Sequence, residues 1–246
     1  ARTIVRTNTT VIAALMVERG EADAMICGTS RDYGWHLSAV LDVIGLTEGV
    51  GDVSALSVLI LATGTYFFCD THVTPDPTAE ELVDMTVMAA DAIRRFGEEP
   101  KVALLSHSNF GTADTASARK MRAAVALLGE RAPELEVEGE MQADVALNEE
   151  LRARIFPDSR FRGRPNLFVF PSLDAANSAF NLVKALGDGL PVGPILLGAA
   201  APAHITTPSV TARGLVNLSA LAVVDAQRHA AEGPDVSAAA PGPESP

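Results

Sequence analysis

The sequence predicts an α/β fold, in which a mostly parallel sheet is covered by helices. Short apolar runs that favour strands alternate along the chain with longer segments whose apolar residues recur at helical spacing. Of the 246 residues 48% are hydrophobic, so the chain can bury a sizeable core in one or two domains. Together these two observations indicate strands joined by helical crossovers.

The expected elements are delimited by glycines and by capping residues. Gly20 ends the first helix, and Thr78-Ala79-Glu80-Glu81 forms a capping box that opens another. Thr63-Gly64-Thr65 lies between two β-rich runs and predicts a hairpin. The expected helices cover residues 9–19, 33–44, 78–95, 113–128, 143–154, 175–186 and 210–231, and the expected strands cover 22–27, 56–62, 66–69, 102–105, 135–141, 167–170 and 194–197.

Charge and composition exclude several classes of function. The chain has 31 acidic and 19 basic side chains, a net charge of −12, which argues against a nucleic-acid surface. It has no visible signal peptide and no apolar run of membrane-spanning length, so we expect a cytoplasmic protein with no membrane partner. Cys27 and Cys69 lie in apolar runs without metal-ligand spacing, which predicts buried, reduced thiols and no metal site.

The two ends of the chain differ in character. Ala1 is followed at once by a helical pattern, so the sequence reads as a piece of a longer chain. Residues 232–246 are rich in Gly, Pro, Ala and Ser and lack apolar periodicity, which predicts a disordered tail.

Polar segments follow four of the expected strands. In a parallel sheet the carboxyl ends of strands meet at one edge, where ligands usually bind, so these segments predict a ligand cleft. The loop after the strand at 102–105 also precedes a helix, whose positive end favours an anion. For each segment taken alone helix capping is the favoured interpretation, and only the four together make a cleft equally favoured. The segments are Ser106-His107-Ser108-Asn109, Gly139-Glu140-Met141-Gln142-Ala143-Asp144, Pro171-Ser172-Leu173-Asp174-Ala175-Ala176-Asn177, and Gly198 with His204-Ile205-Thr206-Thr207.

Other polar groupings give weaker indications. Glu140 and Asp144 have the spacing of one helical turn, which suits acid–base chemistry, although such carboxylates are more often caps or solvated. Arg160-Phe161-Arg162-Gly163-Arg164 is a basic cluster that suits a phosphate, but a solvated loop is the favoured interpretation. The chain lacks a dinucleotide fingerprint and a P-loop.

Five segments, taken in order over residues 6–227, resemble motifs of the phosphate acetyltransferases and butyryltransferases. They match the G-x-A-D-(A/G)-x-(V/I)-x-G, S-x-S-x-x-G, G-x-x-Q-x-D, N-x-x-x-F-P-x-L-(D/N)-x-x-N and G-P-I patterns of that family. These segments are residues 20–28, 106–111, 139–144, 166–177 and 193–195.

Within the family, the chain is most similar to the C-terminal phosphotransacetylase-like region of large bacterial NADP-dependent malic enzymes. Segments 66–71, 140–144 and 217–227 carry that likeness. It implies a three-layer α/β/α fold like that of phosphotransacetylase and isocitrate dehydrogenase, with two subdomains around a cleft. Residues 1–54 and 195–231 would form subdomain I, incomplete at its N-terminus, and residues 55–194 subdomain II.

The same resemblance implies ligands and partners. Acetyl-CoA would be the ligand or effector, and the chain would form a dimer or higher homo-oligomer attached to a malic enzyme catalytic domain. NADP and a divalent metal would belong to that absent domain, and this region itself would need no cofactor. The residues expected to contact the acyl-CoA are Ser106, Ser108, Asn109, Gly111, Asp174, Asn177 and Thr207.

Departures from the family pattern bear on catalysis. Active members carry Ser-Arg-Gly soon after the G-P-I strand and then an Asp, whereas this chain has Thr207-Pro208-Ser209 and later Gly214. Proline provides neither a charge nor an N–H to hold phosphate. Ser38 stands where the resemblance leads us to expect an arginine in the helix after Gly28, and Arg213 could supply a positive charge from another position.

Three functions therefore stay open. The first is an acyl-CoA-binding regulatory and dimerisation region of a malic enzyme, without malic activity and without effective acyl transfer. The alternative is an active phosphate acyltransferase that converts acetyl-CoA and phosphate to acetyl phosphate and CoA. The third is a purely structural dimerisation module, built on the helices at residues 175–186 and 210–224.

Overall fold

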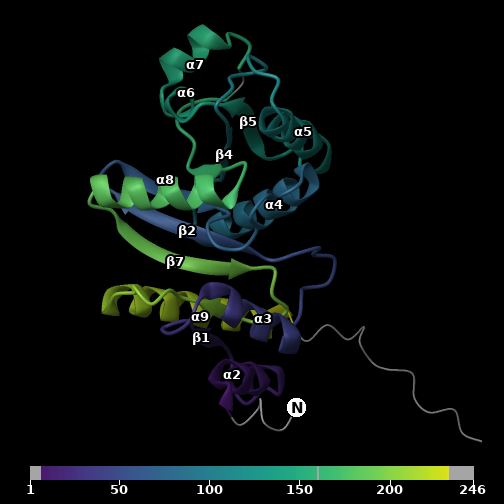
Figure 1. Ribbon diagram of the computed structural model, residues 1–246, viewed down its shortest axis with the longest axis vertical. Coiled ribbons are helices and arrows are strands. Elements are labelled where there is room, and N and C mark those ends of the chain that lie inside the picture. The colour runs from purple at the N-terminus through teal and green to yellow at the C-terminus, as the bar shows by residue number, and fades with distance from the viewer. Residues whose placement is uncertain (1–6, 160, 233–246) are drawn as a thin grey trace, which may run out of the picture.

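The computed structural model describes residues 7–159 and 161–232 and has the expected α/β architecture. A six-stranded sheet forms a large unit, and a two-stranded sheet forms the core of a small unit below it (Figure 1). The helices are α2 (Thr9–Glu18), α3 (Tyr33–Val43), α4 (Ala79–Arg95), α5 (Ala116–Arg131), α6 (Ala143–Leu147), α7 (Glu149–Ile155), α8 (Leu173–Leu186) and α9 (Ala212–Glu232). The strands are β1 (Met25–Cys27), β2 (Ser54–Leu61), β3 (Gly64–Cys69), β4 (Lys101–Leu105), β5 (Glu136–Met141), β6 (Leu167–Val169), β7 (Leu190–Leu197) and β8 (Ala203–Ile205).

Strand order sets where the functional loops lie. The large sheet has the order β5-β4-β6-β3-β2-β7, and β3, β6, β4 and β5 run parallel. Because β2 is antiparallel to both β3 and β7, the carboxyl end of β7 also lies at the edge where the parallel strands end. In the small unit β1 and β8 are parallel, with Met25 opposite Ala203 and Cys27 opposite Ile205.

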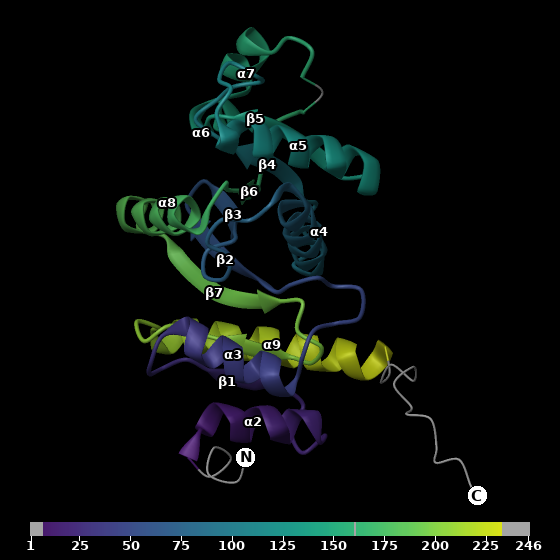
Figure 2. The same cartoon turned by 45° about the vertical axis from the view of Figure 1, so that its right-hand side comes forward.

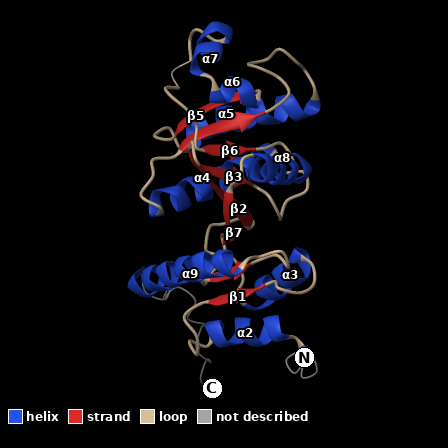
Figure 3. Ribbon diagram, turned by 90° about the vertical axis from the view of Figure 1, so that its left-hand side faces the viewer, coloured by secondary structure: helices blue, strands red, loops and turns tan. Residues whose placement is uncertain are grey.

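Each face of the large sheet has its own apolar core. Alternate side chains of a strand point to opposite faces, so Phe67 packs beneath α4 and α5 while Phe68 packs beneath α8 and α6. Figures 2 and 3 show α4 and α8 on opposite sides of the strands. A third apolar cluster, which includes Ala14, Val40 and Ile205, packs α2 and α3 against β1 and β8 in the small unit. Helix α9 contributes its buried Leu218 to the first core instead.

Local signals explain several element boundaries. The capping box is confirmed: Glu81 N donates to Thr78 Oγ1 at 3.2 Å, and Thr78 N donates to Glu81 Oε2 at 2.6 Å. Cys27 and Cys69 are free thiols, half-buried and buried respectively. No helix within the described ranges is both long and apolar enough to cross a membrane.

Three expectations about the elements need correction, and one strand was missed. The hairpin turn is Ala62-Thr63, since Leu61 pairs with Gly64 and the loop has two residues. The helix expected from 113 begins at Ala116, because Thr115 provides its cap. The helix expected over 143–154 is two helices, because Asn148 ends one and caps the next through Leu151 N. The strand β8 was not expected from the sequence at all.

Sheet pairing also bears on the division into subdomains. Strand β7 continues from Leu190 to Leu197 and pairs with β2 along its length, so a boundary between residues 194 and 195 would cut a single strand. The chain leaves the large sheet only after Leu197. Of the expected disordered tail, Glu232 is the last residue of α9, and residues 233–246 lie outside the described residues.

Candidate functional site

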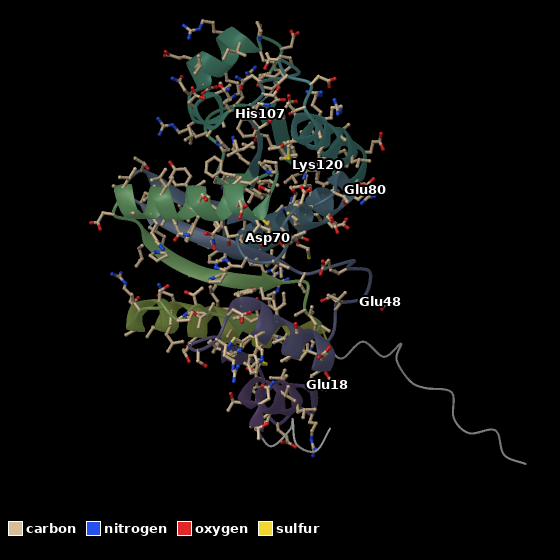
Figure 4. All side chains as sticks on the ribbon, in the orientation of Figure 1. Glu18, Glu48, Asp70, Glu80, His107 and Lys120 are labelled. Carbon is tan, nitrogen blue, oxygen red and sulfur yellow. The ribbon has the colours of Figure 1, made fainter. Side chains whose placement is uncertain are left out.

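Two of the expected site segments meet at the carboxyl edge of the large sheet. The loop after β4 and the residue after β5 are joined by two hydrogen bonds. Asn109 Oδ1 accepts from Gln142 N at 2.8 Å, and Gln142 Nε2 donates to the His107 carbonyl at 2.9 Å. Figure 4 shows His107 near the top of the large unit. The sequence-based placement of these two segments side by side is consistent with this geometry.

The loop does not offer its backbone to an anion in the way the sequence suggests. Ser108 is fully buried, and its hydroxyl accepts from Ala113 N at 3.0 Å. Glu140 accepts from two further loop donors, Phe110 N through its carbonyl and Gly111 N through Oε1. The remaining loop N–H groups with acceptors inside the fold are those of Ser106, Ser108, Asn109 and Thr112. Most of the loop's N–H groups are therefore engaged within the fold, and a ligand here would meet mainly side chains.

Glu140 supports this loop from below and is not half of an acid–base pair. Its side chain is fully buried in β5, and Oε1 lies 3.0 Å from Arg122 Nη1 of α5. Asp144 is exposed in the first turn of α6, where its Oδ1 accepts from Val145 N. The expectation of two carboxylates on one helix is wrong, because the first belongs to a strand.

Lysine 120 is a cation at the same edge that sequence reasoning did not single out. Its ammonium donates to the Pro171 carbonyl at 2.8 Å and pairs with Asp76, so it ties α5 to the turns after β6 and β3 (Figure 4). Its side chain is only 17% exposed. A lysine within an amphipathic helix carries no sequence signal that separates it from solvated lysines.

The segment after β6 contributes one structural and one exposed group. Asn177 Nδ2 donates to the Thr71 carbonyl at 3.1 Å and so joins α8 to the loop after β3. Asp174 is exposed in the first turn of α8. The helix cap itself is Ser172, whose hydroxyl accepts from Ala175 N. These residues line the same sheet edge as Ser106 and Gln142.

Thr207 and Pro208 belong to the small unit instead. They follow β8, not β7, and Thr206 N donates to the Cys27 carbonyl at 2.8 Å. Gly28 has φ +109°, and a Cβ there would lie 2.1 Å from the Thr206 carbonyl oxygen, so the ends of β1 and β8 approach closely. Thr207 Oγ1 lies 3.0 Å from Ser209 Oγ, and Pro208 is exposed. The expectation that the 204–207 run follows a large-sheet strand is therefore wrong.

Gly214 lies in the first turns of α9. Its N–H donates to Thr211 Oγ1 at 3.0 Å, and a Cβ at this position would meet Val210 Cγ2 at 3.2 Å. A side chain at this position would require Val210 to shift by a few tenths of an ångström.

The two units meet at a buried polar cluster that sequence reasoning missed. The ring of Tyr33 from α3 lies 5.0 Å from that of His72, and the Tyr33 hydroxyl is buried without a hydrogen-bond partner. Asp70 follows β3, at the middle of the molecule in Figure 4. Its carboxylate accepts from four backbone N–H groups, those of Ala55, His72, Val73 and Thr74.

Burial shifts the protonation of this cluster. It raises the pKa of the Tyr33 hydroxyl, to which the nearby Asp70 and Cys27 add. It also raises the pKa of Asp70, against the lowering effect of the four N–H donors. It lowers the pKa of His72 to about 4, with Lys184 adding to the shift. At neutral pH the junction therefore holds a neutral phenol and a neutral imidazole.

Part of the expected basic cluster makes hydrogen bonds within the fold and is not free for a ligand. Arg162 N donates to Glu136 Oε1 and its Nη1 donates to the Ser159 carbonyl, both at 3.1 Å. Arg164 is exposed beside an apolar cavity, and Arg160 lies outside the described residues.

Comparisons with known proteins agree with this architecture. An "NAD-dependent malic enzyme" of Rhizobium meliloti (strain 1021) is 60% identical over 92% of this chain, and an "NADP-dependent malic enzyme" of Escherichia coli (strain K12) is 51% identical over 89%. The chain spans 29% of the length of each of these two relatives. A "Phosphate acetyltransferase" of Paracoccus denitrificans is 38% identical over 85% of the chain and 68% of its own length.

The solved structures give the same relationship. A phosphotransacetylase from Streptococcus pyogenes superposes with a TM-score of 0.84 at 28% identity, over 89% of this chain and 68% of its own. The EutD phosphotransacetylase from Staphylococcus aureus gives a TM-score of 0.78 at 29% identity, over 90% and 67%. The family described as "Phosphate acetyl/butaryl transferase" matches residues 1–223. The chain therefore belongs to the phosphate acetyl/butyryl transferase family.

Proposed function

We propose that the chain is an acyl-CoA-binding regulatory region of a larger malic enzyme and does not itself transfer acyl groups to phosphate. The single observation behind the proposal is the turn after β8, where Pro208 stands exposed in place of the family's arginine. Without a guanidinium the turn has no charge to hold phosphate. Acetyl-CoA is the effector we propose, and the nicotinamide and metal chemistry would belong to the catalytic part of the longer enzyme.

The occupied loop supports the loss of catalysis. Phosphate binding at the Ser106–Gly111 segment would require free N–H donors, and Glu140 already accepts from two of them, Phe110 N and Gly111 N. Hydroxyl and amide side chains suit the polar parts of an acyl-CoA without stabilising a charged transition state. We propose that Ser106, Asn109 and Thr207 provide these contacts, with Asp174 and Asn177 on the other wall of the cleft.

In this proposal regulation rests on thermodynamic linkage between ligand binding and the arrangement of the two units. A ligand that contacts both the large-unit loop and the Thr207 turn would favour one arrangement of the two units, and thereby one state of an attached catalytic domain. The Tyr33–His72 contact, at 5.0 Å between ring centroids, is where such an arrangement would be sensed.

Calorimetric titration of the 246-residue chain with acetyl-CoA, combined with an assay of phosphate-dependent CoA release, tests the proposal. We expect binding without turnover, and weaker binding after Ser106→Ala or Thr207→Val. Ser219→Ala on α9 serves as the matched control, because this hydroxyl donates only to its own helix at the Leu215 carbonyl. Absence of acetyl-CoA binding by folded protein would contradict the proposal.

An active phosphate acyltransferase is the second candidate, favoured by the retained serine loop. Phosphate oxygen would attack the thioester carbonyl, the C–S bond would break, and CoA would leave as a thiolate that then takes up a proton. Phosphate-dependent CoA release that survives purification and is lost with Thr207→Val would establish this function and exclude the purely regulatory one.

A further inference from the structure

The loop after β1 and the loop after β3 meet where the two units join. Tyr33 begins α3 shortly after the end of β1, and His72 lies in the loop after β3, with its ring 5.0 Å from that of Tyr33. Val73, next to His72, packs against the apolar cluster of the small unit, as Tyr33 does. Ligands of α/β folds usually bind at the carboxyl ends of parallel strands. Two such ends, one from each unit, come together at this contact.

Tyr33 brings an unsatisfied polar atom to the contact. Its hydroxyl is buried and has no hydrogen-bond partner within residues 7–159 and 161–232. A buried donor without an acceptor is costly, so the position calls for an explanation. Asp70, the nearby carboxyl at the middle of the molecule in Figure 4, is already supplied with donors, because it accepts from the backbone N–H groups of Ala55 and residues 72–74.

The surroundings of the hydroxyl define which ligand group suits it. Burial, together with Asp70 and Cys27, raises the pKa of Tyr33, so the hydroxyl keeps its proton and can donate it in a hydrogen bond. The Asp70 carboxyl close by disfavours an anionic group such as phosphate. A neutral oxygen acceptor, such as a carbonyl oxygen, meets both conditions.

We propose that the Tyr33 hydroxyl donates a hydrogen bond to the thioester carbonyl oxygen of a bound acyl-CoA, and that this bond makes the site select acylated CoA over free CoA. The inference rests on the proposed function and identifies the part of the ligand that the regulatory region recognises. The thioester carbonyl is a neutral acceptor that acetyl-CoA has and free CoA lacks.

Recognition of the carbonyl would also be coupled to the arrangement of the two units. The Tyr33 hydroxyl is buried, so a ligand reaches it only if the loops part at the Tyr33–His72 contact. Binding of an acylated ligand therefore favours the parted arrangement, whereas free CoA gains nothing from it.

Calorimetric titration of the 246-residue chain with acetyl-CoA, CoA and S-ethyl-CoA tests the proposal. In S-ethyl-CoA a methylene replaces the thioester carbonyl, so the two acylated and alkylated ligands differ little except in the acceptor. We expect the unchanged chain to bind acetyl-CoA roughly three- to tenfold more tightly than S-ethyl-CoA, the range that one hydrogen bond supplies. Tyr33→Phe should abolish this preference and leave the affinities for CoA and S-ethyl-CoA unchanged.

Tyr66→Phe is the matched control, because the chain has two tyrosines and Tyr66 lies in the β2–β3 hairpin. Its hydroxyl lies 3.4 Å from each of two oxygens of Thr63. This variant should retain the full preference for acetyl-CoA.

Thermal unfolding provides a second readout that a merely structural role would not give. Removal of an unsatisfied donor should leave the melting temperature of ligand-free Tyr33→Phe equal to or above that of the unchanged chain. Acetyl-CoA should raise the melting temperature of the unchanged chain more than that of the variant. A lower melting temperature of the ligand-free variant would mean that the hydroxyl has a partner within the fold, and would overturn the proposal.

The titrations separate failure of this inference from failure of the proposed function. If acetyl-CoA binds but Tyr33→Phe keeps the preference over S-ethyl-CoA, or loses affinity for all three ligands equally, Tyr33 does not contact the carbonyl and only this inference is overturned. Equal binding of acetyl-CoA and S-ethyl-CoA by the unchanged chain has the same meaning. Absence of acetyl-CoA binding by the folded, unchanged chain would overturn both.

Discussion

Arg122 and Glu140 form an ion pair beneath the serine loop, with Arg122 Nη1 3.0 Å from Glu140 Oε1. The carboxylate of Glu140 is fully buried, whereas the side chain of Arg122 is 32% exposed. The same Oε1 accepts from Gly111 N, so the pair holds the far end of the loop in place. The other carboxylate oxygen, Oε2, is buried without a hydrogen-bond partner. The ion pair with Arg122 therefore offsets the cost of burying the Glu140 charge.

Arg122→Met should therefore destabilise the fold more than an ordinary surface change. Removal of one partner of a fully buried pair costs about 3–5 kcal/mol, and the partial exposure of Arg122 reduces this to roughly 2 kcal/mol. Urea unfolding measures the loss. Arg119→Met, which removes an exposed pair with Asp114 on the same helix, should cost less than about 0.5 kcal/mol. Equal losses in the two variants would show that the buried carboxylate does not need Arg122.

Arg152 presents a different case, a fully buried arginine that serves backbone carbonyls. It is 1% exposed, and its guanidinium donates to the carbonyls of Ala146 and Gly163 at 2.8 Å each and to those of Val145 and Phe161 at longer range. Arg152→Met keeps the apolar stem but leaves these acceptors unsatisfied, so we expect a loss of about 3 kcal/mol. Arg154→Met, on the exposed side of the same helix, should change the midpoint of thermal unfolding little. A small effect of Arg152→Met would mean that water replaces the guanidinium.

Much of the fold follows from the sequence because its signals are local. The capping box at Thr78 and the glycine stops depend on neighbouring residues, and the structure reproduces them. Strand β8 was missed because three residues give no periodicity, and Ala203–Ile205 is a strand only through its pairing with β1. Pairing partners far apart in the chain cannot be read from a short run.

The candidate site was harder to predict for the same reason. The rule that parallel strands end at one edge placed Asn109 and Gln142 together correctly, but it could not show that Ser108 and Glu140 accept hydrogen bonds from loop N–H groups. Nor could it show that Lys120 reaches Pro171, or that Tyr33 meets His72 across the two units. These contacts depend on side-chain directions that only the assembled sheet determines.

The half-buried imidazole of His72 predicts a specific pH dependence of stability. Its pKa falls from an ordinary value near 6.5 to about 4 in the folded chain, mainly through burial. The unfolded chain therefore takes up a proton before the folded chain does, so the stability contributed by neutral His72 is present above pH 6.5 and is lost as the pH falls to about 4. The pKa of Asp70 is raised in the folded chain, so protonation of Asp70 favours the folded state as the pH falls, the opposite of the effect of His72.

His72→Gln isolates this contribution, because glutamine does not titrate and can still bond Thr71 Oγ1, which lies 2.9 Å from His72 Nδ1. The free energy of unfolding, measured in urea at pH 7.5, 6, 5 and 4.5, should fall more steeply for the unchanged chain than for the variant. The difference between them should narrow steadily below pH 6.5. A constant difference across this range would show that His72 is not held neutral by the fold. Asp70 remains in both proteins and so cancels in the comparison.

The close approach of β1 and β8 makes Gly28 a sensitive position in the small unit. An alanine Cβ there would lie 2.1 Å from the Thr206 carbonyl oxygen, and the backbone has φ +109°, which side chains rarely adopt. Steric overlap and backbone strain together should cost roughly 3 kcal/mol or more, and they should displace the Thr207 turn.

Gly129→Ala provides the opposite control, because its Cβ would meet nothing within 4 Å inside α5. A glycine within a helix is less favourable than alanine by about 1 kcal/mol, so this variant should be more stable. Differential scanning calorimetry of both variants decides the matter: if Gly28→Ala melts at or above the temperature of the unchanged chain, the strands do not approach as closely as described.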